Sequence, residues 1–177
     1  MMQSSPYTAR RVLILLARLA LGVLLIYAGS AKLFIPFFAY TKLFIPGISP
    51  HPPIRIALAL FATQIDAYQL LPPWAVTQLA HTLPFVEISL GLLLIIGWRL
   101  RIWASFASAL LLGFFAIVVR TYALGVEIPC GCFGPGEALT FKTVLRDASL
   151  VAVSLLLTVF AFLEGRASHP WSREVEG

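Results

Sequence analysis

Two cysteines, Cys130 and Cys132, are the residues of this sequence best suited to covalent chemistry. They are the only cysteines in the chain, and they form a Cys-Gly-Cys motif with Gly131. Phe133 and Gly134 follow this motif directly. A disulfide between residues this close together needs a bent backbone, which glycine permits. Strained and exposed disulfides are comparatively oxidising and exchange readily with thiols. The motif therefore favours a thiol-disulfide exchange site.

A structural bridge and a metal site are the alternatives for the cysteine pair. A disulfide that closes so short a loop removes little chain entropy, so a purely structural bridge would stabilise the fold only weakly. Two thiolates with no histidine nearby provide at most half of a tetrahedral zinc site, and we predict no metal. Both alternatives, together with inert thiols, stay open beside the exchange site.

Four of the charged residues that lie within apolar stretches are candidates for a functional site: Lys32, Glu87, Arg120 and Asp147. Charges are costly in hydrocarbon, so such residues are functional candidates by default. One interpretation is a buried polar site below the cysteine loop that accepts a proton or contacts a quinone carbonyl. The other is that Lys32 and Arg120 extend to the membrane interface and Glu87 is uncharged. Because an isolated carboxylate in hydrocarbon is costly, we expect Glu87 to share a polar site with Lys32 or Arg120.

The chain that carries these residues is too apolar for a water-soluble domain. Hydrophobic residues make up 59% of its 177 residues and charged residues 12%, whereas soluble domains contain about 25% charged residues. It contains four apolar runs, each long enough to cross a bilayer as a helix, at 12–38, 74–97, 102–124 and 144–163. The predicted fold class is all-α, a polytopic membrane protein that forms a single domain, a bundle of four transmembrane helices.

Basic residues at the ends of the apolar runs predict the orientation of the helices. They lie near both termini and in the turn between the second and third runs: Arg10, Arg11, Arg99, Arg101, Arg166 and Arg173. By the positive-inside rule both termini are cytoplasmic, and the loops at 39–73 and 125–143 face outward. The cysteines then lie in an oxidising compartment. Basic residues placed in this way contact membrane lipid and do not indicate binding of nucleic acid.

The first outer loop is predicted to contain a short helix at the membrane surface. Prolines prevent helix formation in the first half of this loop, but residues 54–69 have a helical pattern. The residues expected to supply apolar contacts are Leu58, Leu60, Phe61 and Ile65.

Glycines and aromatic residues have predicted structural roles in the bundle. Four glycines are expected to allow close approach of helices, namely Gly22, Gly29, Gly91 and Gly113. An aromatic belt is expected at the span ends, formed by Tyr68, Trp74, Trp98, Trp103 and Tyr122. His81 lies off the helical face of Glu87, so we expect a packing or interfacial role for it and not that of a ligand.

Four short motifs resemble the MauE branch of the DoxX-like membrane proteins. They are Gly29-Ser-Ala-Lys32-Leu, Tyr68-Gln-Leu-Leu-Pro72, Pro84-Phe-Val-Glu87 with Gly91, and Cys130-Gly-Cys-Phe-Gly134 followed by Leu145-Arg-Asp147. They occur in the family's order, and the resemblance covers about residues 12–163. The stretch around 40–60 departs from the family because it is longer than expected. This difference bears on which partner docks there.

The resemblance implies a four-helix membrane fold related in shape to the vitamin K epoxide reductase and DsbB class of thiol oxidoreductases. It also implies a location in the bacterial inner membrane and thioredoxin-like partners. The member that gives the branch its name is associated with maturation of methylamine dehydrogenase, whose small subunit needs many disulfides.

Two functions are consistent with the residues and with the resemblance. In the first, the chain is a membrane thiol-disulfide oxidoreductase that exchanges with a periplasmic thioredoxin-like protein or client and passes electrons to a quinone. DsbB-like enzymes use two cysteine pairs and this chain has one, so electrons leave the pair directly or a second pair belongs to another subunit. In the second, the chain is a non-catalytic accessory subunit of a larger membrane complex, and the disulfide only holds the loop.

Overall fold

The computed structural model describes residues 6–34, 54–126 and 139–167 of the chain. These residues form the helices α1 (Pro6–Phe34), α3 (Ile54–Asp66), α4 (Pro73–Ile96), α5 (Leu100–Ala123) and α6 (Phe141–Ala167). Apart from α3, each helix contains an apolar segment of 23 or 24 residues, long enough to cross a membrane. At about 1.5 Å per residue, each segment spans about 35 Å, which exceeds the hydrocarbon thickness of about 30 Å. The predicted all-α fold with four membrane helices is confirmed.

The helix bounds agree closely with the predicted spans. The described part of α1 ends at Phe34, and residues 35–38 of the first predicted span lie outside the described residues. Helix α6 begins at Phe141, three residues before the predicted start at 144. Its start is stabilised by a cap, because the Thr140 N–H donates to the Thr143 hydroxyl oxygen at 3.4 Å.

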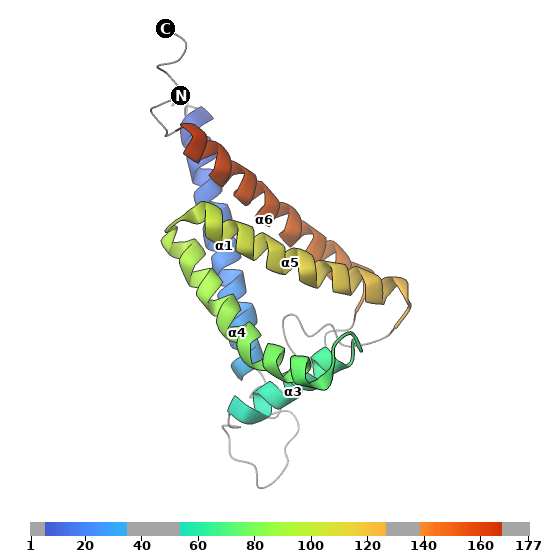
Figure 1. Ribbon diagram of the computed structural model, residues 1–177. Helices are drawn as coiled ribbons and strands as arrows, with labels where there is room; N and C mark the ends of the chain where they lie inside the picture. Colours follow the sequence, from blue (N-terminus) through green and yellow to red (C-terminus); the bar gives the residue numbers. More distant parts are fainter. Residues whose placement is uncertain (1–5, 35–53, 127–138, 168–177) are drawn as a thin grey trace.

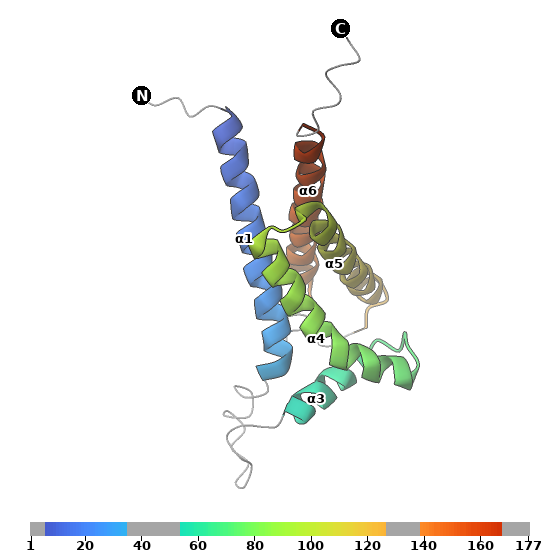
Figure 2. The same ribbon diagram turned by 60° about the vertical axis from the view of Figure 1, so that its left-hand side comes forward.

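The membrane helices form two pairs, α1 with α4 and α5 with α6. Contacts within each pair are more extensive than contacts between the pairs. Figure 1 shows the pairs spreading apart from the α4–α5 turn towards the end of the molecule that carries α3. Figures 1 and 2 both show the start of α1 and the end of α6 at the opposite end from α3. The two pairs of helices therefore diverge in the half of the bundle near α3.

Glycines allow α1 and α4 to pack with their backbones in contact. A methyl group added at Gly29 would lie 2.6 Å from the carbonyl oxygen of Pro84, and one added at Gly91 would lie 2.5 Å from that of Gly22. Close approach is therefore confirmed for Gly22, Gly29 and Gly91. The expectation for Gly113 is wrong, because this glycine is on an exposed face of α5 where an added methyl group meets nothing within 4 Å.

A residue of α1 caps the C-terminal end of α4. The Arg18 side chain donates from Nε to the Leu94 carbonyl oxygen at 3.0 Å and from Nη2 to that of Ile95 at 2.8 Å. The helix ends at Gly97, whose left-handed φ of 76° lets its N–H donate to the Leu93 carbonyl oxygen at 2.9 Å. Carbonyl groups at a helix end have no partner within the helix, so Arg18 satisfies two of them.

Helix α4 also contains the buried Pro84. Figure 1 shows α4 bent along its length, as expected because proline removes a backbone hydrogen bond within a helix.

A short helix is present between the first and second membrane helices, as predicted; it is α3, which packs against α4 and α1. Leu58 and Phe61 are buried in these contacts, and Ile65 is half-buried. Leu60 is 38% exposed and lies outside these contacts with α4 and α1. It lies about 100° around the helix from Phe61, so the two residues do not share a face.

The predicted aromatic belt is present at the helix ends with one exception. The exposed residues Trp74, Trp98 and Tyr122 lie near the ends of α4 and α5, and Tyr68 follows α3. Trp103 is half-buried and packs against a core cluster that contains Ile14 and Leu94. Its ring therefore contributes to packing of the bundle.

Candidate functional site

A cavity of about 180 Å³ lies among α1, α3, α4, α5 and α6. Most of its wall consists of leucine, isoleucine and phenylalanine side chains from these helices. The polar or charged residues of the wall are Lys32, Gln64, Tyr68, Glu87 and Asp147. A largely apolar cavity with a few polar groups is typical of a site for a small ligand.

An ion pair between α1 and α4 forms one side of the cavity. The Lys32 Nζ atom donates to both carboxylate oxygens of Glu87, at 2.5 Å and 2.6 Å. Lys32 is 7% exposed and Glu87 is 3% exposed, so both groups are shielded from the surroundings. The expectation that Glu87 shares a polar site with Lys32 is confirmed.

Two phenylalanines lie next to the Lys32 ammonium group. Its Nζ atom is 5.5 Å from the ring centroid of Phe61 on α3 and 5.6 Å from that of Phe114 on α5. At these distances the electron-rich faces of the rings attract the cation. Lys32 therefore links α1 with α3, α4 and α5 at a single point beside the cavity.

Asp147 contributes a second acidic group to the cavity wall from α6. It is 8% exposed, and its Oδ1 atom accepts a hydrogen bond from the Nε atom of Arg146 at 3.0 Å. The structure thus brings three of the four predicted intramembrane charges, Lys32, Glu87 and Asp147, to one cavity.

Arg120 is exposed on α5 and does not line this cavity. It follows the buried Val118 by two residues, which places it about 200° further around the helix. Arg120 therefore does not pair with Glu87, whose partner is Lys32.

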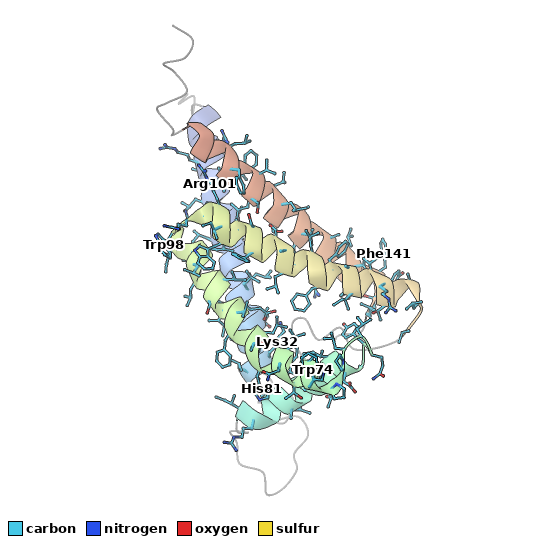
Figure 3. The ribbon with its side chains drawn as sticks, viewed as in Figure 1. Lys32, Trp74, His81, Trp98, Arg101 and Phe141 are labelled. Atoms are coloured by element: carbon cyan, nitrogen blue, oxygen red, sulfur yellow. The ribbon has the colours of Figure 1, made fainter. Side chains whose placement is uncertain are left out.

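The labelled side chains show how the charges are distributed along the bundle. In Figure 3, Trp98 and Arg101 lie at the end with the α4–α5 turn, whereas Lys32 lies in the half near α3 with Trp74 and His81. His81 is exposed, and its Nδ1 atom lies 2.8 Å from the Thr77 carbonyl oxygen. It has the surface polar role that was one of the two expected for it.

The predicted catalytic residues Cys130 and Cys132 lie outside the described residues, as do Gly131, Phe133 and Gly134. The helices on either side of that segment are described. Ile117 and Val118 near the end of α5 line the cavity, and so do Asp147 and Leu150 near the start of α6. The segment with the cysteines is thus joined to the two helices at the end where they border the cavity.

The two aromatic neighbours of Lys32 were not identified from sequence as part of the site, nor was Gln64 in the cavity wall. Phe114 was assigned no role, and Phe61 was expected only to anchor the short helix. With 13 phenylalanines in the chain, nothing in the sequence distinguishes these two as neighbours of a lysine. Within the described residues there is also no group of three or more histidine, cysteine, aspartate or glutamate residues that could hold a metal ion.

Comparison with known families gives a match to the family described as methylamine utilisation protein MauE, over residues 10–160. The chain belongs to the MauE family. The matched range of this MauE family member includes both cysteines and the charged residues of the cavity, and the resemblance found in the four motifs is confirmed. No curated protein and no solved structure matches the chain significantly.

Proposed function

We propose that this MauE family member is a thiol-disulfide oxidoreductase of the bacterial inner membrane that serves a methylamine utilisation system. Cys130 and Cys132 exchange with a periplasmic thioredoxin-like protein or with a disulfide-containing client. The observation that carries the proposal is the cavity with a buried ion pair, next to the helix ends to which the Cys-Gly-Cys segment is joined. Purely structural helices would not need charges buried at that position, because such charges are costly in a membrane.

The exchange reaction is balanced without a further reactant. A thiolate of the partner attacks one sulfur of the Cys130–Cys132 disulfide, so a mixed disulfide forms and the other cysteine leaves as a thiolate. The second thiol of the partner then attacks the mixed disulfide. The partner is oxidised to a disulfide and both cysteines of this chain are reduced. Their reoxidation passes two electrons and two protons to a lipid-soluble acceptor.

The start of α6 favours the thiolate that leaves in the first step. Helix N-termini and nearby basic residues stabilise thiolates. Helix α6 begins at Phe141, nine residues after Cys132, and carries Lys142 and Arg146 in its first turns. These groups provide positive charge close to the segment that contains the cysteines.

Trapping of mixed disulfides tests the proposal. In a Cys132→Ser variant, Cys130 retains the ability to hold a partner covalently, and the Cys130→Ser variant tests the opposite order of attack. We expect one of the two variants to form an adduct that reduction removes. The measurement is non-reducing electrophoresis of membranes from each variant, with mass spectrometry to identify the adducts.

The variant with both cysteines replaced by serine is the control, and it should form no adduct. If neither single variant captures a protein and the double variant supports its host pathway normally, the oxidoreductase proposal is wrong. The chain then acts as a non-catalytic accessory subunit of a larger membrane complex, and the cysteines only hold the loop.

A further inference from the structure

The cavity beside Lys32 contains features that the exchange reaction does not use. We propose that it binds the ring of a lipid-soluble quinone, with the Lys32 ammonium group donating a hydrogen bond to a ring carbonyl. This inference rests on the proposed function, since the quinone would be the acceptor that reoxidises Cys130 and Cys132. Binding itself requires only the helices and side chains that the structure describes.

The size and lining of the cavity fit a six-membered ring. An apolar cavity of about 150 Å³ is large enough to bind benzene, and this cavity measures about 180 Å³. Its wall is formed largely by aliphatic and aromatic side chains, among them Leu83, Leu110 and Phe114. The side chains favour an apolar ring over a sugar or a nucleotide.

The cavity also reaches the surface of the protein. Leu70 and Leu71 line it and are 40% and 42% exposed. Both leucines precede α4 and follow α3, so the opening lies at the end of the bundle near α3. An apolar tail attached to the ring could leave the cavity between these leucines.

The ion pair accounts for recognition of a carbonyl group. An ammonium group has three N–H donors, and the two hydrogen bonds to Glu87 use two of them. A carbonyl oxygen of a ligand can accept a hydrogen bond from the third N–H group of Lys32, whereas a hydrocarbon chain has no acceptor for it. Removal of both charges from water is costly unless every donor is satisfied, so an acceptor in the cavity stabilises the pair.

Charged groups on both helix pairs are placed to handle protons. A quinone takes up two electrons and two protons when it is reduced. The Lys32 ammonium group donates hydrogen bonds to the Glu87 carboxylate at the wall formed by α1 and α4, and Asp147 lies on the wall formed by α6. Titratable side chains thus lie on two sides of the cavity.

Binding of decylubiquinone to the purified full-length protein in lipid nanodiscs tests the inference. The readout is equilibrium binding measured by quenching of tryptophan fluorescence, which does not depend on turnover. We expect saturable binding to the wild type and to the variant with both cysteines replaced by serine. Decylbenzene, which has the tail and ring but no carbonyl, should compete weakly.

Two variants change the cavity in different ways. Lys32→Met removes the donor and should weaken binding by about tenfold or more, because hydrogen bonds to charged groups are the stronger ones. Ala28→Leu places extra atoms on a wall residue of the cavity and leaves the ion pair intact, so it should also weaken binding. Arg55→Met and Phe106→Leu are matched controls at exposed positions outside the cavity wall, and both should bind as the wild type does.

Each outcome decides between alternatives. Absence of saturable binding to the wild type, or equal binding by wild type, Lys32→Met and Ala28→Leu, overturns the inference. Equal competition by decylbenzene shows a site for apolar chains without carbonyl recognition and also overturns it. If quinone binds as expected but no mixed disulfide is trapped, the cavity assignment stands and the proposed exchange function falls. If a mixed disulfide is trapped but no quinone binds, the proposed exchange function stands and the cavity assignment falls.

Discussion

Lys32 and Glu87 form the ion pair that connects α1 and α4 beside the cavity. Removing one partner of such a pair leaves an unpaired charge, which is far more costly than replacing both partners with apolar residues. The phenyl rings of Phe61 and Phe114 offset part of the cost of keeping the ammonium group away from water. Variants that lack one partner of this pair should therefore lower the free energy of unfolding by more than variants of a surface salt bridge do.

Glu87→Gln and Lys32→Met should each lower the free energy of unfolding by about 3–5 kcal/mol. The double variant Lys32→Met/Glu87→Met should recover most of this loss, because no charge then remains without a partner. The measurement is reversible unfolding in mixed micelles, analysed as a double-mutant cycle. Asp66→Asn changes an exposed carboxylate at the end of α3 and serves as the control. Single variants as stable as this control would show that the pair contributes nothing.

The helices of each pair are held together by different contacts. Helices α1 and α4 pack through glycines, where backbone atoms of one helix meet those of the other. Helices α5 and α6 share a hydrogen bond between the hydroxyl groups of Ser108 and Thr158 at 2.9 Å. Small residues and interhelical hydrogen bonds are the main sources of helix association in lipid, because lipid is as apolar as the side chains.

Gly29→Ala should destabilise the protein by about 1–3 kcal/mol, as expected when a methyl group is forced into a packed interface. The added group would meet the backbone at Pro84, which cannot move aside as a flexible side chain can. Gly113→Ala is the matched control, since it adds the same methyl group where nothing lies within 4 Å. We expect it to be neutral or to stabilise α5 by up to about 1 kcal/mol, because alanine favours helices. Equal unfolding midpoints for the two variants would contradict this account of the interface.

At the scale of the whole molecule, arginine is more frequent at one end of the predicted bundle than at the other. The start of α1, the end of α6 and the α4–α5 turn lie away from α3, and the turn carries Arg99 and Arg101. The cavity lies in the half of the bundle near α3, and the positive-inside rule predicts that this half faces the outer side of the membrane. A periplasmic partner would then approach the protein from the side of the cavity.

Reporter fusions test this orientation. At Gly97 and Gly177, we expect activity from a reporter that functions only in the cytoplasm and none from a reporter that functions only outside it. At Gly131 we expect the opposite result. The physical reason is the excess of arginine at the predicted cytoplasmic ends. The reversed pattern would place the cysteines in a reducing compartment and remove the basis for disulfide exchange.

The sequence was sufficient to predict the four membrane helices, because long apolar runs leave few alternatives. It was also sufficient to predict a basic partner for Glu87, since a buried carboxylate needs one, but it left both Lys32 and Arg120 as candidates. It could not exclude Arg120 from the cavity. Apolar residues surround helix α5 on all sides, so nothing in the pattern distinguishes the face of Val118 from the face of Arg120. The neighbours of Lys32 from α3 and α5 depend on tertiary packing, which no local spacing encodes.

The cap that Arg18 forms on α4 has a consequence for biosynthesis. The first membrane helix enters the bilayer with two cations, Arg18 and Lys32, whose described hydrogen-bond partners all lie on α4. Until α4 has been synthesised, both cations lack acceptors in the hydrocarbon. The insertion machinery must therefore shelter α1 while the next 60 or so residues are translated. On this basis we expect α1 and α4 to enter the lipid together, once the acceptors of Arg18 and Lys32 on α4 are in place.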